Sequence, residues 1–208
     1  MTAVFSTPDQ TVALTGVHWE TYERLLADQE DRSGPRLYYD CGTLEIMSPS
    51  SRHERTKETL ALFVQLLAGE MGVDFVSVGS TTFRREDLQK GFEPDSCFYV
   101  RNAETIRAKD KIDLSVDPPP DLVIEVAVTN PVLNKLSLYS AAGVPEVWIY
   151  DEDHVEILAL DSKTYRQKAE SSFLPGVTGA TLQEFVFSSR EMKSPAWIKS
   201  VRDWAAKH

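Results

Sequence analysis

The sequence predicts an α/β protein, with a central sheet flanked by helices, in one domain of 208 residues. Two observations predict this class, and the composition is compatible with it. Residues 121–127 are short, apolar and β-branched, as in a strand that runs through the middle of a sheet. A helical pattern and a second apolar segment ending at Asp151 follow, which indicates a strand–helix–strand unit. The composition, 42% hydrophobic and 26% charged, is that of an ordinary globular protein.

Composition also narrows the functional classes. No run approaches the eighteen apolar residues of a membrane span, and the first residues lack the basic start and apolar stretch of a signal peptide. We therefore expect a cytoplasmic protein that does not contact a membrane.

Cys41 and Cys97 stand far apart, each in or beside a predicted strand, and are expected to be reduced core thiols. The four histidines are scattered, which argues against a zinc site.

The N-terminal part of the chain predicts a helix, a hairpin and a second helix. Residues 1–14 show no periodicity and are expected to be a loosely ordered lead. An amphipathic helix should cover 17–29, and 36–40 with 43–47 should pair around Cys41-Gly42. A long helix with a strong apolar stripe should cover 52–71.

The middle of the chain predicts mainly strands. Residues 73–78 and 81–85 read as two strands about a Gly79-Ser80 turn, and a strand over 92–100 follows. A short polar helix or lid is expected at 102–109. In the strand–helix–strand unit, Thr129 or Asn130 can cap the helix with Pro131 in its first turn, and Ala142-Gly143 can end it.

The C-terminal part predicts a second hairpin and two helices. Residues 154–160 and 164–168 alternate well enough to pair at the far edge of the sheet. Helices are expected at 181–187 and 195–206. The second of them carries apolar residues at i, i+3 and i+4 spacing, which should close the core or, as the alternative, form a dimer contact: Trp197, Ile198, Val201 and Trp204.

Two acids in apolar strands mark the candidate site. Glu125 lies inside the most apolar strand, where a carboxylate needs a cationic partner or a chemical role. Asp95 opens another apolar strand, so the two acids could meet on adjacent strands. Lys135 shares a helix face with Leu138 and Tyr139, which lets its ammonium reach the strand ends. An aspartate, a glutamate and a lysine suit metal-dependent phosphodiester hydrolysis.

Several segments in consistent order resemble the Uma family of putative restriction endonucleases, in the PD-(D/E)XK nuclease superfamily. The resemblance spans roughly residues 36–151, and its segments are Gly42–Pro49 with His53, Pro94-Asp95, Pro120–Val126 and Gly143–Asp151. It implies a restriction-endonuclease-like fold with a central mixed sheet. It also implies a DNA endonuclease that uses Mg²⁺ or Mn²⁺.

The resemblance assigns roles to individual residues. Asp95 and Glu125 would be metal ligands, the Val126 carbonyl a further ligand, and Glu45 an auxiliary acid in or near the metal shell. The strand pattern alone favours a Glu45 that faces solvent, and it is the resemblance that favours the functional role. The familiar lysine position, two residues after the glutamate, is Ala127 here, so the lysine that orients the attacking water would be Lys135.

His53 could contact substrate or the groups that surround the metal ligands, although a histidine in a polar first turn is more often simply exposed. The connection to Lys135 is shorter than in relatives. Only residues 126–134 separate Glu125 from Lys135, and the usual acidic position before the helix is missing, with Pro131 near its place.

The net charge of −10 is the main compositional objection to a nucleic-acid enzyme, because affinity for DNA comes largely from Lys and Arg on phosphates. A local rim of basic residues around the site could still bind DNA phosphates. Arg84 and Arg85 are candidates for this substrate binding, although they could also be solvated loop charges. Two alternatives stay open. One is a catalytically inactive nuclease-fold protein with a binding or assembly role; the other is a hydrolase of a small phosphorylated molecule. A homodimer is also possible.

Overall fold

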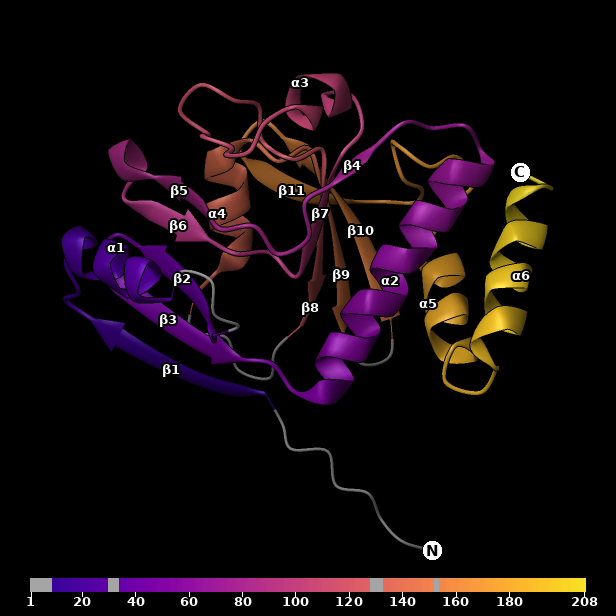
Figure 1. The fold of residues 1–208 in the computed structure, drawn as a ribbon, viewed down its shortest axis with the longest axis horizontal. Coiled ribbons are helices and arrows are strands. Elements are labelled where there is room, and N and C mark those ends of the chain that lie inside the picture. Colours follow the sequence, from indigo (N-terminus) through magenta and orange to yellow (C-terminus); the bar gives the residue numbers. More distant parts are fainter. Residues whose placement is uncertain (1–8, 30–33, 128–132, 152–153) are drawn as a thin grey trace, which may run out of the picture.

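A computed structural model describes residues 9–29, 34–127, 133–151 and 154–208 (Figure 1). The strands in this part of the chain form two sheets, one of five strands and one of six. The smaller sheet is built from the N-terminal half, and the larger one carries the strand–helix–strand unit predicted from the sequence. The α/β class is therefore confirmed, with the strands divided between two sheets.

The five-stranded sheet is antiparallel throughout, in the order β1 (Gln10–Thr15), β3 (Thr43–Ser48), β2 (Arg36–Asp40), β6 (Lys90–Phe92) and β5 (Phe83–Arg85). The β2–β3 pair is the predicted hairpin. Helix α1 (Trp19–Asp28) packs on this sheet through the rings of Trp19 and Tyr22, which contact Tyr39. Aromatic side chains thus hold the helix to the sheet.

The six-stranded sheet is mixed, in the order β11 (Thr164–Lys168), β10 (His154–Asp161), β9 (Glu146–Asp151), β8 (Leu122–Val126), β7 (Ser96–Tyr99) and β4 (Val76–Ser77). Strands β8 and β9 are parallel and are joined through α4 (Lys135–Ala142). A parallel pair needs such a crossover, so the predicted strand–helix–strand unit is confirmed. The predicted β10–β11 hairpin also forms, with β11 at one edge of the sheet.

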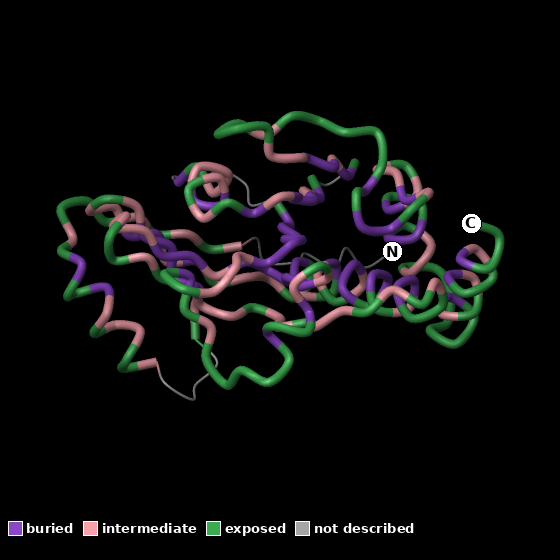
Figure 2. The backbone as a smooth tube through the Cα atoms, turned by 90° about the horizontal axis from the view of Figure 1, so that it is seen from above, coloured by how far each residue is buried: buried purple, intermediate pink, exposed green. Residues whose placement is uncertain are grey.

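Helices cover both faces of the six-stranded sheet. The helices α2 (Ser51–Glu70), α5 (Gly179–Ser188) and α6 (Ser194–Ala205) share one hydrophobic core with the inward side chains of β8 and β9. Helix α4 packs in a second core that also includes side chains of the five-stranded sheet. In Figure 2 the buried residues lie along the inner segments of the chain and the exposed ones along its outer loops. The stripe around Trp197 and Val201 faces the first core, as predicted.

Three expectations about elements are wrong. Residues 10–14 are not a loose lead, because they form most of β1; that strand lies at a sheet edge and alternates only weakly in burial, so it has little pattern to detect. The segments around β4 and β5 do not form a hairpin, because β4 pairs with β7 and β5 with β6, in different sheets.

The third concerns α4, whose N-cap is Asn134. Thr129, Asn130 and Pro131, from which its start was predicted, lie outside the described residues.

The polar segment after β7 does contain a short helix, α3 (Ala103–Arg107). None of the helices described is long and apolar enough to cross a membrane.

Candidate active site

Asp95 and Glu125 lie side by side at one end of β7 and β8. The antiparallel register pairs Ser96 with Ile124, which places Asp95, just before β7, beside Glu125 near the end of β8. The Asp95 N–H donates a hydrogen bond of 3.3 Å to Glu125 Oε1, and the Val126 N–H donates one of 2.6 Å to Asp95 Oδ2. Both acids are buried. The prediction that they meet on adjacent segments of the sheet is confirmed.

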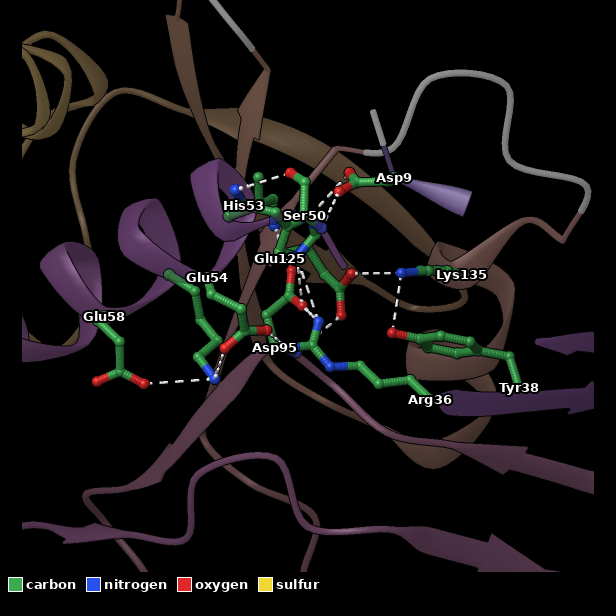
Figure 3. A network of polar contacts seen from close by, with 12 residues as sticks. Asp9, Arg36, Tyr38, Ser50, His53, Glu54, Glu58, Asp95, Glu125 and Lys135 are labelled. Carbon is green, nitrogen blue, oxygen red and sulfur yellow. Dashed lines mark hydrogen bonds and ion pairs between the residues drawn. The ribbon is translucent and has the colours of Figure 1, made fainter. Parts of the chain in front are cut away.

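Lys135 reaches Glu125 from the first turn of α4. Its Nζ lies 2.8 Å from Glu125 Oε2 and 2.9 Å from the hydroxyl of Tyr38 on β2 (Figure 3). Burial by itself would lower the pKa of Lys135, but the neighbouring Glu125 and Tyr38 more than offset it, so this pKa lies above its usual value. Lys135 therefore carries a full positive charge at neutral pH.

Two tyrosines complete the surroundings of Glu125. Tyr139 lies one helical turn after Lys135 and donates a short hydrogen bond to Glu125 Oε1. Burial and then Glu125 raise the pKa of both Tyr139 and Tyr38. Both phenols are therefore neutral donors. A pocket of about 380 Å³, lined by Glu125, Lys135 and Tyr139, adjoins this group.

Arg36, which the sequence reading did not assign to the site, is the main cationic partner of Asp95. Its Nη1 forms an ion pair with Asp95 Oδ1, and its Nη2 donates to Glu54 Oε1 at 2.6 Å. The side chain enters from the start of β2 and is only 4% exposed. A signal existed in the sequence, namely a charged residue at the head of the very apolar strand Arg36-Leu37-Tyr38-Tyr39. Its partner, however, lies in the other sheet.

His53 is buried against Asp95 rather than exposed, because α2 directs its first turn at the strand ends. The Ser50 hydroxyl caps the helix at the His53 N–H, while His53 Nε2 lies 2.8 Å from Asp95 Oδ1 and Nδ1 lies 3.0 Å from Asp9 Oδ2. Burial lowers the pKa of His53, in spite of the opposing effect of Asp9. The neutral imidazole carries one N–H, so it can donate to one of the two carboxylates at a time.

Comparison with known proteins identifies the family and a similar fold. A family model described as "Uma2: Putative restriction endonuclease" matches residues 19–189. The chain belongs to this family. A solved structure with a similar fold is titled a putative nuclease belonging to DUF820 from Anabaena variabilis. The alignment covers 82% of this chain and 99% of the nuclease chain, with 12% sequence identity and a TM-score of 0.54. No functionally curated protein matches.

Glu45, the auxiliary acid suggested by the family resemblance, is buried on β3 and does not face solvent. It lies on the same side of the strand as Met47, and it stands opposite Tyr38 in the β2–β3 register. Its Oε2 accepts the Leu133 N–H at 3.0 Å. Glu45 therefore holds the segment that leads into α4, and its role in a metal shell stays a prediction.

Two other acids of the matching family segments are structural. Asp121 Oδ2 accepts three backbone N–H groups after β7, from Val100, Arg101 and Asn102. Glu146 is fully buried and accepts hydrogen bonds from the Trp148 indole and from the residue 171–172 segment. Each carboxylate satisfies backbone or side-chain donors that burial would otherwise leave unpaired.

Arg84 and Arg85, the predicted substrate-binding pair, each have an acidic partner. Arg84 pairs with Glu23 of α1 at 3.2 Å, and Arg85 makes two hydrogen bonds to Asp87. Arg84 lines a cavity of about 670 Å³ that also reaches Arg36 and Glu93. The structure thus brings Arg84 near the site and turns Arg85 toward Asp87. Their contact with substrate stays a prediction.

The chemistry of the donors suits a hard divalent ion. Within the residues described, no three histidine, cysteine, aspartate or glutamate side chains are grouped to hold a metal. Mg²⁺ is commonly bound by only one or two carboxylates, with water and substrate phosphate completing its shell, so Asp95 and Glu125 fit such an ion. Its arrival would require Arg36 to leave Asp95 Oδ1.

Proposed function

We propose that this protein is a metal-dependent endonuclease that hydrolyses phosphodiester bonds in DNA. The observation that carries the proposal is the contact of Lys135 Nζ with Glu125 Oε2 at 2.8 Å, next to Asp95. This contact assembles two acids and a lysine at one sheet end, although the familiar lysine position is occupied by Ala127. Membership of the Uma2 family, which is described as putative restriction endonucleases, supports the same activity.

Each site residue has a distinct role in this proposal. Asp95 and Glu125 would hold Mg²⁺ or Mn²⁺, with the Val126 carbonyl as a further ligand and Glu45 as an auxiliary acid. A divalent ion there would stabilise charge on the reacting phosphate and lower the pKa of a water molecule. Lys135, whose raised pKa keeps it protonated, orients that water and stabilises developing negative charge as a hydrogen-bond donor. His53 and Arg36 position Asp95.

The direct test is the nicking of supercoiled plasmid DNA by the purified protein with Mn²⁺, compared with Asp95→Ala. We expect the wild type to convert the plasmid to open circles and Asp95→Ala to leave it intact. Equal trace rates for the two proteins would identify a contaminating nuclease and would contradict the proposal.

One observation favours a second candidate, an inactive nuclease-fold protein with a binding or assembly role. Arg36 already neutralises Asp95, so the buried acids are stable without a metal ion. An inactive protein would show neither nicking nor an Asp95-dependent response to divalent ions. Isothermal titration with Mn²⁺, run on the wild type and on Asp95→Ala, therefore separates the two candidates even when no cleavage is detected.

A further inference from the structure

A groove of about 1020 Å³ runs between α2, α5 and α6, on the side of the six-stranded sheet away from α4. Figure 1 shows these three helices side by side. Arg52 and Arg55 from the first turns of α2 line the groove, and so does Arg190 just after α5. We call it the arginine groove.

The three arginines of this groove carry charge that is not neutralised locally. Among the residues that the structure describes, none of the three has a carboxylate within ion-pair distance, and Arg52 and Arg55 are exposed. Two acids, Glu54 and Glu58, also line the groove, but both bind Lys57, and Glu54 binds Arg36 as well. In a chain of net charge −10, the groove is thus a local site of available positive charge.

The arginine groove is linked to the candidate active site through Glu54, which lines the groove and binds Arg36. Arg52 precedes His53, whose imidazole contacts Asp95, and Glu54 connects the groove wall to Arg36 (Figure 3). At the other wall, Arg190 Nη2 donates to the Tyr150 hydroxyl at 2.6 Å.

Tyr150 is the register partner of Val126, whose N–H binds Asp95. Arg52 and Arg190 are therefore each connected, through His53 and Tyr150, to the strand ends that carry the acids.

We propose that the arginine groove binds the phosphate backbone of the DNA beside the bond that is cut, through Arg52, Arg55 and Arg190. This inference rests on the proposed nuclease function and names its substrate track. Arginine suits the role because its planar guanidinium binds phosphate oxygens in pairs and stays charged at all relevant pH values. The ion-paired Arg84 and Arg85 would first have to give up Glu23 and Asp87.

The test is a salt titration of binding to a fluorescently labelled DNA duplex, followed by anisotropy. Ca²⁺ replaces Mg²⁺ so that the duplex is bound without being cut. For the full-length Arg52→Gln, Arg55→Gln variant, we expect weaker binding and a slope of log affinity against log salt that is less steep by about 2, since each phosphate contact contributes about 0.9. The matched control is Lys163→Gln, Arg166→Gln at the β10–β11 hairpin, which should keep the wild-type slope.

The outcomes separate this inference from the function on which it rests. A wild type that nicks plasmid DNA, together with an unchanged slope in the Arg52, Arg55 variant, would overturn the groove alone. An equal loss of slope in the control variant would also overturn it, because the effect would then follow net charge. A wild type that neither binds nor nicks DNA would overturn both. Equal melting temperatures of the variants exclude misfolding as the cause.

Discussion

Lys135 Nζ lies 2.8 Å from Glu125 Oε2, although only residues 126–134 separate the two along the chain. The short connection does not keep the ammonium from the acid, because α4 begins at Lys135 itself and the side chain extends from its first turn. The same ammonium binds Tyr38 of the other sheet. Lys135 thus joins the two sheets at the point where the acids meet.

Arg36 should compete with divalent ions for Asp95. Replacing it in Arg36→Met removes a positive charge from Asp95, so we expect Mn²⁺ affinity measured by isothermal titration to rise about tenfold, equivalent to about 1.4 kcal/mol. Without metal, the variant should be less stable, by up to about 3–5 kcal/mol, because a buried carboxylate loses its partner. Arg84→Met, which removes an arginine paired outside the site, should leave Mn²⁺ affinity unchanged. Weaker Mn²⁺ binding by Arg36→Met would show that Arg36 supports the metal site instead.

Glu146 should matter to folding and not to metal binding. Glu146→Ala leaves the Trp148 indole and the donors at 171–172 without their acceptor, and each buried unpaired group costs about 1–3 kcal/mol. We expect urea unfolding to show a loss of at least about 2 kcal/mol. The control Glu156→Ala, at a partly exposed position of β10, should change stability by less than about 0.5 kcal/mol. A similar small effect at Glu146 would contradict the structural role.

The two cysteines should differ sharply in reactivity. Cys41 is exposed in the β2–β3 turn, contrary to the expectation of a core thiol, whereas Cys97 is fully buried and its pKa is raised by burial. An aromatic disulfide reagent should therefore modify one thiol per chain in the native protein and two in denaturant. Rapid modification of both thiols in the native state would show that the β7 region opens readily.

The sequence patterns correctly predicted those structural features that depend on residues close together in the chain. The apolar run of β8, the turn residues at Gly143 and the Lys135–Tyr139 helix face are all local, and the structure has them as expected. The proximity of Asp95 and Glu125 could be predicted because a carboxylate in an apolar strand needs a partner or a chemical role.

Contacts between the two sheets could not be predicted from local sequence patterns. Arg36 meets Asp95 only because β2 of one sheet lies against the end of β7 of the other, and nothing in either segment encodes that arrangement. For His53 the sequence left both a contact with site groups and an exposed position open, because a polar first turn usually faces water; in the structure the turn points at the strand ends and His53 contacts Asp95. Likewise the Gly79-Ser80 turn signal suggested that β4 pairs with β5, whereas β4 pairs with the more distant β7 and β5 pairs with the following strand, β6.

The most direct measurement of the central claim is plasmid cleavage with Mn²⁺ by the wild type, Lys135→Met and the Ala127→Lys, Lys135→Met double variant. Lys135→Met should be less stable, because the buried Glu125 loses its cationic partner, but it should still fold and bind Mn²⁺, since Tyr139 still donates to Glu125, while its cleavage rate falls at least about 100-fold. The lysine restored at the familiar position in the double variant should recover part of the rate. Wild-type cleavage by Lys135→Met, with Asp95→Ala inactive in the same assay, would contradict the account by showing that the lysine of α4 has no part in the reaction.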